Sequence, residues 1–84
     1  MQRKNELVPG DMCTTWSKDD VMVWDVNNLN SCHGCADRNG VMLVIGAVYE
    51  KDYGEHHIVI DDLIVLNAKF GVVCIAREYV KKIT

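Results

Sequence analysis

The C-terminal half of this chain contains three apolar runs that are rich in Val and Ile and are separated by short polar turns. The runs are VMLVIGAVYE at 41–50, HHIVIDDLIVLN at 56–67 and GVVCIA at 71–76. β-Branched residues favour strands, and no stretch of the chain shows a helical period longer than a turn or two. Gly46 in the first run and Asp61-Asp62 in the second indicate bulges or bends. The sequence therefore predicts an all-β fold.

The N-terminal half predicts one or two further strands and a long connection. Pro9-Gly10-Asp11 is a turn signal before a first strand at 12–16. Residues 21–26 are either a short second strand or an extended piece of loop, and residues 27–40 are rich in Asn, Ser, Gly and Asp, which indicates a connection. The ending REYVKKIT predicts a single turn and a short last strand. The total is five to six strands.

The length of 84 residues allows one domain, spanning 1–84, with residues 1–7 expected to be flexible. No apolar run approaches the roughly 18 residues needed to span a bilayer. The stretch MQRKNELVPG lacks the apolar centre of a signal peptide. We therefore expect a cytoplasmic protein without a membrane partner.

The net charge of −3 is unevenly distributed along the chain. Residues 11–62 hold ten acidic and three basic side chains, whereas residues 69–84 hold four basic side chains and one acidic side chain. Affinity for nucleic acid comes mostly from neutralising phosphates, which disfavours an acidic domain. The charge pattern favours a protein partner.

Three stretches together resemble the SH3-like small barrels of small bacterial and bacteriophage proteins: Val8-Pro9-Gly10-Asp11-Met12, Gly40 to Tyr49, and Val72 to Ile83. The resemblance implies a partly open antiparallel barrel, a long first loop, and a single 3₁₀ turn at Arg77 to Val80 before the last strand. It also implies docking to another protein, in the host cytoplasm if the chain is phage-encoded. The aromatic ALYDY cluster and the KOW motif are missing, so neither polyproline binding nor RNA binding is carried over.

Cys32 and Cys35 have the C-x-x-C spacing with which two thiolates reach one zinc ion. No second such pair exists, so the remaining ligands would come from Cys13, Cys74, His33, His56 or His57. The alternative is an exposed, reduced pair in a loop, with Cys13 and Cys74 as small core residues. We expect no cofactor, with zinc on Cys32 and Cys35 as the open alternative.

The chain carries no recognisable catalytic motif, so we predict a non-enzymatic protein-binding module, such as an accessory factor or inhibitor. Aromatic residues are enriched at binding hot spots, and the expected contact residues lie in turns and in the long connection. They are Trp24, Asn28, Asp37, Arg38 and Tyr53.

Three alternatives stay open. Nucleic acid could bind the basic C-terminal segment, with Tyr79 or Phe70 stacking on bases. A small-ligand or enzymatic pocket could form from His56, His57 and Asp62. Homo-oligomers could form through an unpaired strand edge.

Overall fold

The structure, a computed structural model, describes residues 7–16, 19–28, 31–37, 40–53 and 56–83, with the backbone alone at 49–53 and 56–60. Strands and one short 3₁₀ helix make up its regular structure, and the all-β prediction is confirmed. Within the described ranges no helix is long and apolar enough to cross a membrane. The elements are β1 (Met12–Thr15), β2 (Val21–Asp25), β3 (Cys32–Ala36), β4 (Met42–Tyr53), β5 (His56–Asn67), β6 (Gly71–Ala76), η1 (Arg77–Tyr79) and β7 (Val80–Lys82).

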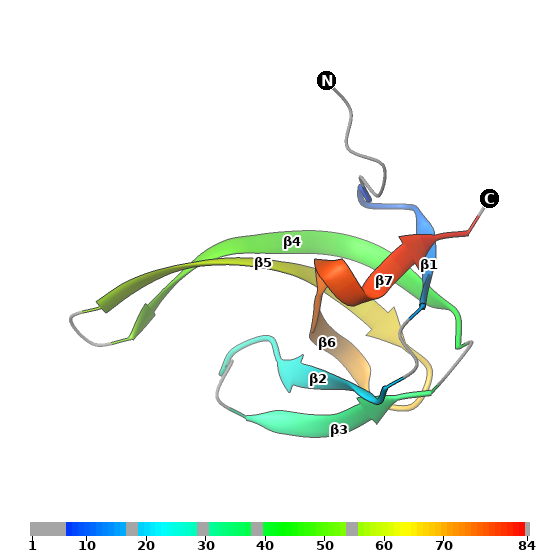
Figure 1. The fold of residues 1–84 in the computed structure, drawn as a ribbon, viewed down its shortest axis with the longest axis horizontal. Helices are drawn as coiled ribbons and strands as arrows, with labels where there is room; N and C mark the ends of the chain where they lie inside the picture. Colours follow the sequence, from blue (N-terminus) through cyan, green and yellow to red (C-terminus); the bar gives the residue numbers. More distant parts are fainter. Residues whose placement is uncertain (1–6, 17–18, 29–30, 38–39, 54–55, 84) are drawn as a thin grey trace.

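All strand pairs are antiparallel and belong to one open sheet, in the order β3-β2-β6-β5-β4-β1-β7. The β4–β5 hairpin is the longest part of the sheet and extends beyond the other strands (Figure 1). Its register shifts between Val44 and Gly46, where the glycine predicts a bend, and again between Val48 and Glu50. The sheet ends at β3 on one side and at β7 on the other.

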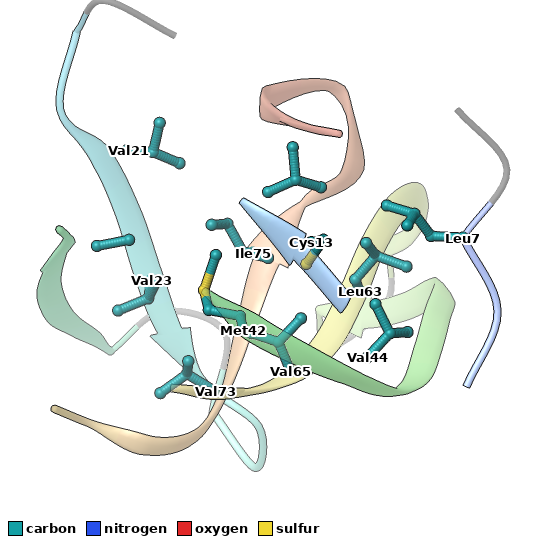
Figure 2. Close-up of a cluster of buried hydrophobic side chains, with 12 residues drawn as sticks. Leu7, Cys13, Val21, Val23, Met42, Val44, Leu63, Val65, Val73 and Ile75 are labelled. Carbon is teal, nitrogen blue, oxygen red and sulfur yellow. The ribbon is translucent and has the colours of Figure 1, made fainter. Parts of the chain in front are cut away.

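The buried side chains lie in the space that the curled sheet encloses (Figure 2). Alternate residues of the strands point inward, as the period of a half-buried strand requires. Cys13 and Cys74 are both fully buried, as predicted, Cys13 within this core and Cys74 opposite Trp24 on the other face of the sheet. Leu7, in the stretch expected to be flexible, is only 3% exposed and joins this core, whereas residues 1–6 lie outside the described ranges. The largest fully buried side chains are Met42, Leu63, Ile75, Val23, Val44, Val65, Val73 and Val80.

Seven strands lie within the described residues, rather than the predicted five to six. The difference lies in the long connection after β1, where residues 21–25 form a strand and residues 32–36, predicted as loop, form its partner. Val21 pairs with Ala36, and both side chains are buried. The connection therefore contains a β-hairpin, β2–β3, that contributes to the core. A 3₁₀ turn precedes the last strand, at Arg77–Tyr79.

Candidate functional site

A groove of about 280 Å³ lies between the outer face of β2 and η1. Val21 and Val23 of β2 point into the core, so Met22 and Trp24 face outward. Tyr79 of η1 lines the same groove, and Met22 and Tyr79 remain 46% and 41% exposed. The groove therefore has an apolar, largely aromatic surface open to solvent.

Carboxylates border this groove on two sides. Asp19 and Asp20 line it directly. A neighbouring hollow of about 340 Å³ shares Ala76 with the groove and is lined otherwise by Asp61, Asp62 and Glu78. The two hollows meet at Ala76, and we call them together the acidic groove, which is lined by Asp19, Asp20, Val21, Met22, Trp24, Asp61, Asp62, Ala76, Glu78 and Tyr79.

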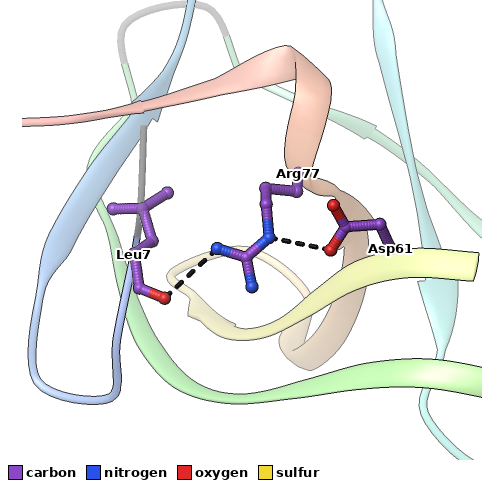
Figure 3. A network of polar contacts seen from close by, with 3 residues as sticks. All are labelled: Leu7, Asp61 and Arg77. Carbon is purple, nitrogen blue, oxygen red and sulfur yellow. Dashed lines mark hydrogen bonds and ion pairs between the residues drawn. The ribbon is translucent and has the colours of Figure 1, made fainter. Parts of the chain in front are cut away.

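The position of η1 depends on Arg77, whose side chain is 11% exposed. This side chain lies between Leu7 and Asp61 and contacts both (Figure 3). Its Nε donates to Asp61 Oδ1 at 2.8 Å, and its Nη1 donates to the Leu7 carbonyl at 3.2 Å. Trp16 Nε1 donates to the Glu78 carbonyl at 2.8 Å. These bonds tie η1 to β5 and to the segments on both sides of β1, which fixes Tyr79 over the groove.

Asp62 has a raised pKa relative to its ordinary value of 3.8, first because of burial and then because of the Asp61 and Glu78 carboxylates. Between the unfolded and folded pKa values the folded chain binds more protons, so the free energy of unfolding falls as pH rises through this window. Above the folded pKa, the ionised carboxylate keeps destabilising the fold. An incoming cation at this place would relieve the repulsion.

We expect Asp62→Asn to raise the urea midpoint at pH 7, and to leave it unchanged once the pH is well below 3.8, where the unfolded carboxyl is also protonated. Asp61→Asn is the matched control. It removes the 2.8 Å ion pair with Arg77 and should lower the midpoint at pH 7. Urea titrations at a series of pH values measure both; a lower midpoint for Asp62→Asn at pH 7 would contradict the burial of a charged Asp62.

Of the predicted contact residues, the structure places Trp24 in the groove. Asn28 is exposed in the turn between β2 and β3, where its backbone N–H donates to the Asp25 carbonyl at 3.3 Å, and Asp37 is exposed after β3. Neither is among the described residues that line the groove. Arg38 lies outside the described residues, and Tyr53 is described only by its backbone, which pairs with His56.

No motif of the sequence singles out Met22, Asp19 or Asp20, and Tyr79 stands out there only as an aromatic residue that could stack on bases in the nucleic-acid alternative. For Met22 the signal is the alternation of β2, since buried Val21 and Val23 require residue 22 to face outward. Asp19 and Asp20 directly precede this strand in the sequence, which places them close to its outward-facing residues.

Three of the four basic side chains at 69–84 contact other groups of the chain. Arg77 bonds Asp61 and Leu7, as described, and Lys82 Nζ lies 3.5 Å from Asp11 Oδ1. Lys69 Nζ lies 5.3 Å from the centre of the Phe70 ring, which packs against the core. This arrangement does not favour a phosphate-binding surface.

The histidines and Asp62 lie in different parts of β5. His57 pairs with Asp52 near the tip of the β4–β5 hairpin, whereas Asp62 pairs with Val48 and Ala76 in the body of the sheet. Five residues of strand separate their backbones by about 16 Å. The structure does not describe the side chains of His56 and His57. The backbone separation does not favour one pocket formed by these histidines and Asp62.

Cys32 and Cys35 are exposed on the edge strand β3, whereas Cys13 and Cys74 are buried. Burial, with the Asp11 carboxylate, raises the pKa of the Cys13 thiol to about 11. In the part of the chain that the structure describes, no three His, Cys, Asp or Glu side chains lie together in a way that could hold a metal ion. The four ligands of a closed zinc site are therefore not assembled from these residues.

Comparisons of the chain with protein-family models, with curated proteins and with solved structures find no match. The function is therefore inferred from the acidic groove and its surroundings.

Proposed function

We propose that this chain is a non-enzymatic protein-binding module that docks a basic, apolar segment of a partner protein into the acidic groove. The observation that carries the proposal is the apolar strip of Met22, Trp24 and Tyr79 within a surround of carboxylates. We further propose that the fold is a small barrel of the SH3-like kind. The strand order β7-β1-β4-β5-β6 and the 3₁₀ turn between β6 and β7 support this assignment.

The free energy that the groove can contribute to binding decides which kind of partner suits it. Covering a half-exposed apolar side chain contributes about 1 kcal/mol, roughly half of its full burial value. Met22 and Tyr79 are exposed and Trp24 is partly buried, so the three groove side chains together give too little for tight binding, because association itself costs several kcal/mol. Charge complementarity must supply the rest and would also accelerate the encounter.

An Arg or Lys of the partner would meet the carboxylates of Asp62 and Glu78, and it would favour the ionised form of Asp62, which burial and the neighbouring carboxylates disfavour. The same negative surround opposes a nucleic-acid backbone. A protein segment with a cation next to an aliphatic or aromatic side chain fits both halves of the groove. Such a module acts by docking, as an accessory factor or inhibitor does.

The proposal is tested by selecting phage-displayed random peptides on the immobilised chain and measuring the affinity of the enriched peptides by fluorescence anisotropy. We expect enriched peptides with Arg or Lys beside an apolar residue. Trp24→Ala and Tyr79→Ala should each weaken binding about tenfold or more, as hot-spot truncations do. Asp20→Lys should weaken binding and reduce its salt dependence.

Two matched control variants test whether the loss of peptide affinity is specific to the residues of the acidic groove. Val72→Ala truncates an apolar side chain on β6 that is 48% exposed and is not among the described residues lining the groove. Asp37→Lys reverses an exposed charge elsewhere. Both should leave the affinity unchanged. Enrichment of acidic peptides, or equal affinities for the Trp24→Ala and Val72→Ala variants, would overturn the proposal.

A further inference from the structure

The β2–β3 register places Cys32 and Cys35 on the same face of the hairpin. In a regular strand, residues three apart point to opposite faces. Here Met22 pairs with Cys35, Val23 with Gly34, and Trp24 with Cys32, so one residue of β3 is extra. That bulge restores both cysteines to the outer face, because directly opposed residues share a face and Met22 and Trp24 face outward.

Three sulfur atoms are thereby gathered on this face. Met22 lies directly opposite Cys35, with a typical Cα separation of about 5 Å for such a pair. Cys32 Sγ contacts the Gly34 carbonyl at 3.6 Å, so the thiol leans along the strand toward Cys35. Both cysteines are exposed free thiols, and Met22 is 46% exposed. An ion could reach all three without opening the core.

The donor set selects the kind of ion. Thiolate and thioether sulfurs are soft ligands and favour Cu(I), whereas zinc sites use four ligands of the Cys, His or carboxylate type. His33 Nε2 lies 3.8 Å from Asp25 Oδ1, which turns this imidazole toward β2. Among the described residues no third His, Cys, Asp or Glu completes a zinc site with the two thiols. We propose that Cys32, Cys35 and Met22 bind one Cu(I) ion per chain on the outer face of the β2–β3 hairpin.

The test is an anaerobic titration of the reduced chain into the coloured Cu(I) complex of bicinchoninate. We expect the wild-type chain to withdraw one equivalent of Cu(I), and an excess of Zn²⁺ not to prevent this. Cys32→Ser and Cys35→Ser should each weaken Cu(I) binding by more than about tenfold, and Met22→Leu by about tenfold, since even outer-shell partners contribute that much. Met12→Leu is the matched control, because Met12 is similarly exposed, at 42%, but lies on β1.

The far-UV circular dichroism of every variant should match the wild type, because the substituted side chains are exposed. Failure of the wild type to withdraw Cu(I), retention of full affinity by Cys32→Ser, or binding of half an equivalent per chain would overturn the proposal. The titration contains no peptide. Its outcome is therefore independent of whether the acidic groove binds a protein segment.

Discussion

Alanine in place of Leu63 should lower the free energy of unfolding by about 3 kcal/mol, within the range for Leu→Ala in a core. Leu63 is fully buried in the middle of β5, between Ala47 of β4 and Ile75 of β6. Removing its side chain loses transfer free energy and leaves a cavity in a small core. A domain of this size has a total stability of about 5–10 kcal/mol, so the loss is a large part of it.

Leu66→Ala is the matched control, since Leu66 lies on the same strand but is 47% exposed. Its substitution should cost less than about 1 kcal/mol. Urea denaturation followed by circular dichroism gives both values. Equal losses for the two variants would contradict the inward orientation of Leu63 and with it the register of β5.

The central strands follow closely from the sequence. β5 and β6 have the bounds of the apolar runs at 56–67 and 71–76, and β4 covers most of 41–50 before extending to Tyr53. In these segments the local signal is strong, because β-branched residues dominate and polar turns separate the runs. The β4 bulge lies where Gly46 interrupts its run.

β3 could not be predicted in the same way. Its sequence CHGCA contains no β-branched residue, and Ala36 is its only buried side chain. It is a strand because β2 supplies hydrogen-bonding partners and because Gly34 permits the bulge. Such pairing depends on tertiary context. The local composition, which is rich in Asn, Ser, Gly and Asp, predicts a loop instead.

The groove was predictable only in part, for a related reason. Trp24 is recognisable as an aromatic residue outside the central runs, but its neighbours are set by the strand order. β2 pairs with β6, and β6 leads directly into η1, so the outer face of β2 comes to lie beside Tyr79. No spacing along the sequence places residues 22 and 79 together.

Gly34→Ala should lower the free energy of unfolding by about 2–4 kcal/mol, through two separate effects. Gly34 has a φ of +141°, which L side chains rarely adopt. A Cβ at this position would also lie 2.8 Å from Cζ of Phe70, whose ring packs against the core. Either the ring or β3 must move, and we expect the bulge to be lost from the β2–β3 hairpin.

Gly71→Ala separates the two effects, because Gly71 also has a positive φ, of +77°, but a Cβ there would meet nothing within 4 Å. Gly71→Ala should therefore lower the free energy of unfolding only by the backbone strain, about 1–2 kcal/mol. Phe70→Leu removes the aromatic Cζ. In that background the cost of Gly34→Ala should fall toward that of Gly71→Ala, as measured by urea denaturation of the four chains of the double-mutant cycle. A Gly34→Ala cost that stays the same with and without Phe70 would show that the ring does not press on β3, and that backbone strain alone makes glycine necessary at the bulge.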